Sequence, residues 1–289
     1  MEKNDNLRVF VAGGSRAGSK EIYVKEAYEL GKKIVEMNFR LEFGLSNIGI
    51  MGAVAQGVLD CVKCQEEKAP ISGITTPEYM QYYESAEILQ KLDNIVVAET
   101  LEERKQKLLD SDFVVFAPGG VGTLDELAYD CVAMQDGLIG VKPFIFYNVD
   151  GFFYHLLEYL KDISSTGFAD PIPFIVVDNS LELGVAFQLL KLKYSEHDNK
   201  FDAYAHSRQV MYELPYFVQQ VKGGLHTEDD IIRKMYNISH YGNGDDRSQL
   251  ADEIEQAFNQ KELERLNARL QKSQDNMKTV QDKIKDIDK

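Results

Sequence analysis

Short apolar runs with strand character alternate with helical periods from the N-terminus to about residue 193. The expected strands are residues 7–12, 40–43, 71–75, 94–98, 112–117, 143–147 and 174–178. Strands that are separated by helices usually pair in parallel, and the helices then cover both faces of the sheet. The sequence therefore predicts an α/β fold with a parallel sheet between two helical layers.

Helices are expected in the segments between these strands. One apolar stripe has the i, i+3, i+4, i+7 spacing of a helix that packs on a sheet, and it consists of Val24, Ala27, Tyr28, Gly31 and Ile34. Further helices are expected at residues 47–64, 99–110, 123–135, 151–162 and 180–193.

The chain has 289 residues, which is more than one core usually fills, since single cores stop growing near ~250 residues. The strand pattern also stops after residue 193. We therefore expect an α/β domain over 1–193, an irregular or helical linker region over 194–246, and a long C-terminal helix over 247–289. The last segment contains neither Pro nor Gly.

Apolar residues of this last segment occupy the a and d positions of one heptad frame, which only Ser273 interrupts. They are Leu263, Leu266, Leu270, Met277, Val280, Ile284 and Ile287. We expect this stripe to be buried against another helix. Two interpretations remain open: a coiled coil with a second subunit, and an amphipathic helix that packs on its own domain.

The charge of the chain restricts its partners. Forty-seven acidic and 32 basic residues give a net charge of −15, which disfavours nucleic acid and an anionic membrane surface. No apolar run approaches the roughly 20 residues of a membrane span, and the first residues lack the pattern of a secretory signal. We expect a soluble, cytoplasmic protein. A small phosphorylated ligand remains compatible, because helix N-termini bind anions locally.

The three cysteines, Cys61, Cys64 and Cys131, are too few and too irregular for a disulfide framework. Cys61 and Cys64 form a C-x-x-C pair, but no second Cys or His pair accompanies it. Packing in reduced form is therefore favoured over a zinc or redox site.

The strongest motif is PGGVGT at residues 118–123, which connects an apolar strand directly to a helical period. Glycines at Gly119, Gly120 and Gly122 let the backbone turn sharply and approach a ligand. The free N–H groups at the start of the helix then point toward an anion. In an open parallel sheet, ligands bind at the carboxyl ends of the strands, so this loop predicts a phosphate site.

Thr123 and Glu126 match the T-x-x-E pattern of a capping box, in which each side chain accepts a hydrogen bond from the other residue's backbone. A carboxylate beside an anion loop could equally act on a bound phosphosugar. The spacing alone supports both roles.

Two other glycine-bearing turns follow the first two strands, at residues 13–19 and 44–52. The first fits neither the dinucleotide pattern G-x-G-x-x-G nor the Walker pattern, so binding of NAD or ATP is not predicted. Gly14 and Ser15 can still contact a nucleotide. The second turn, which contains Gly44, Gly49 and Met51, is expected to line the same crevice.

A charged segment, Glu102-Glu103-Arg104-Lys105, falls on a predicted helix before the fifth strand. By itself it is typical of a solvated helix face. In the alternative interpretation, Arg104 points into the crevice, where its planar guanidinium could bind a phosphate or orient a ligand.

These motifs together resemble the LOG (Lonely Guy) family, often labelled putative lysine decarboxylases, over residues 7–193. The resemblance rests on their order and spacing: GSRAG at 14–18, GIMG at 49–52, ERK at 103–105, SD at 111–112 and PGGVGTLDE at 118–126. It implies a Rossmann-like fold, a homodimer or higher homo-oligomer, and hydrolysis of the N-glycosidic bond of a nucleoside 5′-monophosphate without a metal or cofactor.

The resemblance also implies residue roles. Arg104 and Glu126 fall on the family's catalytic positions. Its phosphate site falls on Gly119, Gly120, Gly122 and Thr123, with Gly14, Ser15 and Lys105 beside them, and a base pocket is implied at Gly44, Gly49 and Met51.

Two positions depart from the family pattern: Gly44-Leu45-Ser46 replaces a run of three glycines, and Leu101-Glu102 replaces Met-His. A module that binds a nucleotide without turnover, and signals through the helical tail, is therefore the alternative. A decarboxylase would need pyridoxal phosphate on a lysine, and the sequence indicates no such lysine.

Overall fold

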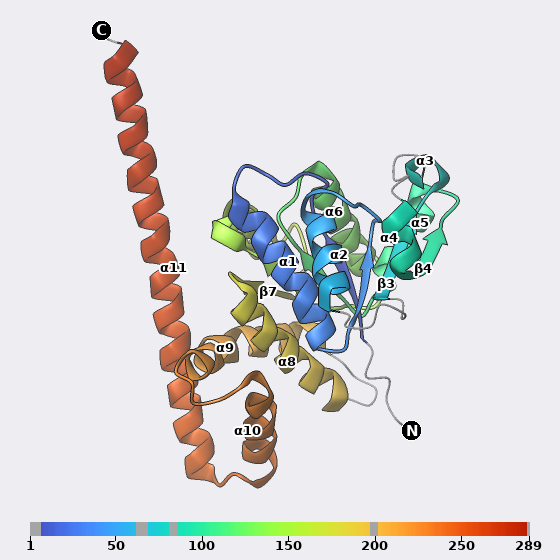
Figure 1. Ribbon diagram of the computed structural model, residues 1–289. Coiled ribbons are helices and arrows are strands. Elements are labelled where there is room, and N and C mark those ends of the chain that lie inside the picture. Colours follow the sequence, from blue (N-terminus) through green and yellow to red (C-terminus); the bar gives the residue numbers. More distant parts are fainter. Residues whose placement is uncertain (1–6, 62–68, 81–85, 197–201, 288–289) are drawn as a thin grey trace. The chain divides into compact units, whose positions relative to one another are not determined.

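The computed structural model describes residues 7–61, 69–80, 86–196 and 202–287. Its seven strands form one parallel sheet in the order β4-β3-β2-β1-β5-β6-β7 (Figure 1). The strands are β1 (Arg8–Ala12), β2 (Arg40–Phe43), β3 (Ala69–Thr75), β4 (Leu92–Val97), β5 (Phe113–Phe116), β6 (Phe144–Tyr147) and β7 (Phe174–Val177). All seven expected strands and the predicted Rossmann-like α/β class are confirmed.

The strand order reverses beside β1. From β1 the chain proceeds to β2, β3 and β4 on one side of the sheet, whereas β5, β6 and β7 follow on the other side. The loops after β1 and β5 therefore diverge at the carboxyl edge, which is where open α/β sheets bind ligands.

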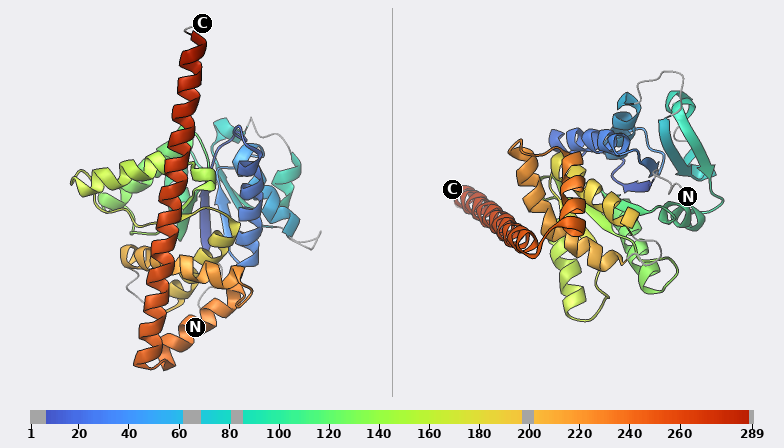
Figure 2. Two further views of the ribbon diagram at one scale, coloured as in Figure 1. Left: turned by 90° about the vertical axis from the view of Figure 1, so that its left-hand side faces the viewer. Right: turned by 90° about the horizontal axis from the view of Figure 1, so that it is seen from below.

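Helices connect the strands and cover both faces of the sheet. They are α1 (Glu21–Glu36), α2 (Gly49–Cys61), α3 (Pro77–Met80), α4 (Ala86–Lys91), α5 (Leu101–Leu109), α6 (Val121–Gln135), η1 (Val149–Gly151), α7 (Tyr154–Ser165) and α8 (Ser180–Glu196). In the right-hand view of Figure 2, the blue helices α1 and α2 lie on one side of the sheet and the green helices α6 and α7 on the other.

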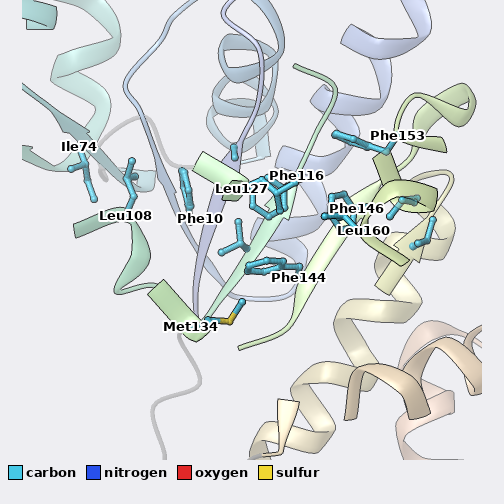
Figure 3. Close-up of a cluster of buried hydrophobic side chains, with 14 residues drawn as sticks. Phe10, Ile74, Leu108, Phe116, Leu127, Met134, Phe144, Phe146, Phe153 and Leu160 are labelled. Carbon is cyan, nitrogen blue, oxygen red and sulfur yellow. The ribbon is translucent and has the colours of Figure 1, made fainter. Parts of the chain in front are cut away.

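The core follows from the alternation of side chains along each strand. On one face, Phe10, Phe116 and Phe146 pack with Leu127 of α6 and Leu160 of α7 (Figure 3). On the opposite face, the rings of Phe39, Phe113 and Phe187 pack together, with centroids 5.4 to 5.7 Å apart. Helices thus cover both faces of the sheet, which explains why β5, β6 and β7 consist of apolar and aromatic residues.

Only part of the apolar stripe predicted for α1 is buried, since Val24 and Tyr28 remain half-buried. Ala27, Gly31 and Ile34 are buried as expected. A Cβ atom on Gly31 would lie 2.0 Å from the carbonyl oxygen of Val54, and one on Gly57 would lie 2.0 Å from that of Tyr28. These glycines therefore allow α1 and α2 to approach each other closely.

The contacts divide the chain into one unit up to Met211 and a second from Tyr212 to Lys289. The remaining helices are α9 (Ala203–Lys222), α10 (Glu228–Tyr241) and α11 (Gly244–Ile287). A capping box between Thr227 and Asp230 starts α10. The long C-terminal helix is confirmed and begins at Gly244. The domain limits at 193 and 246 stay predictions.

None of the described helices is long and apolar enough to span a membrane.

Candidate active site

Arg104 is held at the carboxyl edge of the sheet. Helix α5 begins after Thr100, whose hydroxyl oxygen accepts a hydrogen bond from the Glu103 amide at 3.1 Å. In the next turn, Arg104 Nε donates to the carbonyl of Ile74 at 3.0 Å, and Nη2 donates to that of Gly44 at 3.4 Å. Its side chain is 12% exposed. The solvated-face interpretation is therefore wrong for Arg104, because its side chain is mostly buried and its Nε and Nη2 atoms donate to carbonyls at the ends of β3 and β2.

Glu126 of α6 meets the same guanidinium. Its Oε1 lies 3.9 Å from Arg104 Nη1, and its side chain is 17% exposed. Burial raises the pKa of Glu126 to about 7, and the positive charge of Arg104 opposes this rise. The carboxyl group can therefore gain or lose a proton near neutral pH.

The capping-box interpretation of Thr123 and Glu126 is wrong. Helix α6 begins at Val121 with Gly120 as its N-cap, and no side chain caps it. Thr123 thus lies inside the first turn, where its buried hydroxyl has no hydrogen-bond partner among the residues that the structure describes. The first intrahelical bond runs from the Leu124 amide to the Gly120 carbonyl at 3.1 Å. The amides before Leu124 remain available to an anion.

The three glycine-bearing turns meet at this edge. The Gly14 amide donates to the Pro118 carbonyl at 3.1 Å, and the Ile50 amide donates to the Gly14 carbonyl at 2.9 Å. Gly49 has φ +65°, and a Cβ atom there would lie 2.4 Å from the carbonyl carbon of Ser15. Ser15 itself is exposed. The structure therefore brings together the turns after β1, β2 and β5.

The glycine loop at residues 118–123 is crowded at one glycine and open at the other two. A Cβ atom on Gly119 would lie 2.1 Å from the Thr123 hydroxyl oxygen, whereas one on Gly120 or Gly122 would meet no atom within 4 Å. Gly119 is thus required by packing, and the other two glycines leave the start of α6 open.

Lys105 contacts two side chains of α6. Its ammonium pairs with Asp125 at 2.6 Å and lies 5.2 Å from the ring centroid of Tyr129. Met51, by contrast, lies beside Arg104: its sulfur is 3.7 Å from the Cβ position of Gly44.

The altered turn after β2 keeps a glycine-like backbone. Leu45 has φ +59°, in the left-handed region that favours glycine, and its side chain is 2% exposed. A Cβ atom on Gly73 of β3 would lie 2.4 Å from Leu45 Cδ1. The absence of a side chain at Gly73 therefore makes room for Leu45, and the Gly44 carbonyl still reaches Arg104.

Three residues near the site were not singled out in the sequence. The ring of Tyr79 lies 5.6 Å from the Arg104 guanidinium carbon. Asp130, one turn after Glu126, is 1% exposed, and burial raises its pKa to about 8. Lys142 is also buried, and its ammonium donates to the carbonyls of Leu109 and Ser111 at the end of α5. Glu126 and Asp130 are four residues apart in the sequence, and this spacing indicates that they lie on the same face of a helix.

Metal ligands are not clustered in the part of the chain that the structure describes: it holds no group of three or more His, Cys, Asp or Glu side chains suited to a metal ion. Cys61 and Cys131 are free thiols. Cys64 lies outside the described residues, so the proposed packing of the C-x-x-C pair stays a prediction.

Comparison with known proteins identifies relatives of the first unit. A family model described as "Possible lysine decarboxylase" matches residues 51–178. A cytokinin riboside 5′-monophosphate phosphoribohydrolase of Arabidopsis thaliana is 31% identical over 179 residues, which cover 61% of this chain and 75% of the relative. The Mycobacterium tuberculosis protein of the same name is 35% identical over 162 residues, which cover 53% of this chain and 79% of the relative.

Among solved structures, the molybdenum cofactor carrier protein from Chlamydomonas reinhardtii aligns with a TM-score of 0.42 and 19% identity. The alignment covers 61% of this chain and 91% of that one.

Proposed function

The chain belongs to the LOG family of phosphoribohydrolases, and on this premise we propose that it hydrolyses the N-glycosidic bond of a nucleoside 5′-monophosphate. The products are the free base and ribose 5-phosphate. The observation that carries the proposal is the Arg104–Glu126 pair, 3.9 Å apart and next to an open helix N-terminus.

In the proposed reaction, the start of α6 and its glycine loop bind the 5′-phosphate. The binding energy of the phosphate, which is remote from the reacting bond, holds the ribose so that its N-glycosidic bond lies in position for the reaction. Arg104 holds the nucleotide and orients Glu126.

Ionised Glu126 stabilises the oxocarbenium-like transition state and takes a proton from the attacking water. The water oxygen bonds to C1′ as the C1′–N bond breaks. The electron pair of the broken C1′–N bond leaves with the base, which then takes a proton from solvent.

The substrate is tested by incubating the protein with AMP, GMP, CMP, UMP and isopentenyl-AMP and measuring free base and ribose 5-phosphate. We expect release of base from at least one of them. The alternative, a nucleotide-binding sensor without turnover, is favoured by the changed turn at Leu45. Tight binding of a nucleotide without release of base from any of the five would replace the hydrolase with this sensor.

The pH dependence follows from the pKa of Glu126, which burial raises to about 7. Because the proposed reaction needs the carboxylate, we expect kcat to fall about tenfold per pH unit below this value and to level off above it. A raised carboxyl pKa means that the folded state binds this proton more tightly than the unfolded state. The contribution of Glu126 to stability therefore falls as the pH rises from the ordinary pKa of a carboxyl group to about 7. Acidification to pH 5 therefore does not unfold the protein through Glu126. A kcat that stays constant from pH 5 to 8, with circular dichroism unchanged, would contradict the role of Glu126.

A further inference from the structure

Most of α11 has an apolar row that its own unit does not cover. Near its start, Ile254 and Ala257 are buried, and the ring of Phe258 lies 5.5 Å from that of Tyr212. Beyond this point the apolar residues are 52 to 59% exposed. They form what we term the α11 row: Leu263, Leu266, Leu270, Met277, Val280 and Ile284. The side chain of Ile287 lies outside the described residues.

The width of the α11 row indicates what can cover it. Its members follow alternating steps of three and four residues, with one position of the frame taken by Ser273. The other positions from 263 to 284 are polar or charged, apart from Ala268. A helix that packs on a sheet or a globular core usually has a broader apolar face, of three or four residues in every two turns. A narrow a/d seam with a period of 3.5 residues fits a second helix.

The helix also needs such a partner. An isolated helix in water is marginally stable, and in proteins most helical stability comes from packing an apolar face. From Leu263 onward, the described residues of the second unit provide no such packing.

The low net charge of this segment is compatible with a second copy of the same helix as that partner. Residues 263–287 contain six basic and four acidic side chains, whereas the whole chain carries −15. Two copies of this segment therefore repel each other far less than two average surfaces of the protein would. The e positions are the uncharged Asn267, Gln274 and Gln281, so pairing places no like charges together there.

We propose that the α11 row pairs with the α11 row of a second copy of this chain in a coiled coil. This inference is independent of the proposed hydrolase activity. The row spans 21 residue steps, about 32 Å at 1.5 Å per residue. Six half-exposed aliphatic side chains offer on the order of 200–400 Å² per chain. Because stable interfaces usually bury about 800 Å² per partner, the pairing depends on protein concentration.

The test compares the full chain with Leu270→Glu, which places a charge in the seam, and with Ala268→Glu, which adds the same charge at an exposed position outside the row. Molecular mass is measured by light scattering from micromolar concentrations to about 0.1 mM. The full chain and Ala268→Glu should form assemblies with twice as many chains as Leu270→Glu. A chain that ends at residue 261 keeps the packed start of α11 and should behave like Leu270→Glu.

Hydrogen exchange gives a second measurement on the full chain. Amides of residues 263–284 should exchange more slowly as the concentration of wild type rises, and no such change should occur in Leu270→Glu. Equal masses for all four chains over the whole range, with exchange independent of concentration, would overturn the pairing. Equal loss of mass in Ala268→Glu and Leu270→Glu would also overturn it, because the contact would then depend on charge and not on the seam.

Discussion

Replacement of Glu126 by Gln is expected to lower kcat about 10²–10⁴-fold, which is the usual contribution of a positioned acid or base. Gln keeps the size of the side chain but can neither accept a proton from water nor carry the charge that stabilises the transition state. Steady-state kinetics on the best nucleotide of the screen measures the loss. Nucleotide affinity should change little, because the phosphate is assigned to the loop at Gly119–Thr123.

The fold of this variant should be intact. Since burial raises the pKa of Glu126 to about 7, a neutral side chain removes a cost of folding above that pH. The variant should therefore be at least as stable as wild type at pH 8. Glu158→Gln is the matched control, because it makes the same change at a side chain of α7 that is 40% exposed. Retention of full turnover by Glu126→Gln would refute the assignment and leave Glu126 with a structural role.

Replacement of Gly44 by Ala is expected to lower kcat/KM about 10²-fold, since a displacement of about 1 Å at a catalytic group can cost this much. The added Cβ atom would lie 2.1 Å from Arg104 Nη2, so the guanidinium must leave its place beside Glu126. Only the flexible end of the Arg104 side chain has to move. We therefore expect a large loss of activity with a small change in melting temperature.

Gly140→Ala is the matched control for this change, because its Cβ atom would meet nothing within 4 Å. Its kcat/KM should equal that of wild type. Wild-type kcat/KM in Gly44→Ala would show that the observed position of Arg104 is not needed for turnover, and the proposed role of the Arg104–Glu126 pair would then be withdrawn.

The local sequence was sufficient for the strands, the long C-terminal helix and the principal motif. Strands such as Phe113–Phe116 and Phe174–Val177 could be predicted because each is a short, largely buried apolar run. The loop at Gly119–Thr123 could be recognised because its chemistry depends on adjacent residues: a strand end, glycines and a helix start. The long helix α11 could be predicted because its heptad pattern lies within one segment.

The helix boundary at the site could not be predicted from the same pattern. Thr123 and Glu126 have capping-box spacing, yet α6 starts at Val121, two residues before Thr123. A Cβ atom on Gly119 would lie 2.1 Å from the Thr123 hydroxyl, so this side chain is packed under the loop and cannot cap the helix. The contact between Gly119 and Thr123 across the turn therefore determines where α6 begins.

The sequence by itself determined the α/β class, the strands and the glycine loop between β5 and α6, because these follow from the periodicity and backbone requirements of neighbouring residues. Only the tertiary structure decided that Arg104 lies between Ile74, Gly44 and Glu126, and that Leu45 adopts a glycine-like backbone above Gly73. It also decided the burial of Asp130 and Lys142. These features depend on distances between residues far apart in the chain, and burial, which raises the pKa of Glu126, exists only after the sheet and helices have packed.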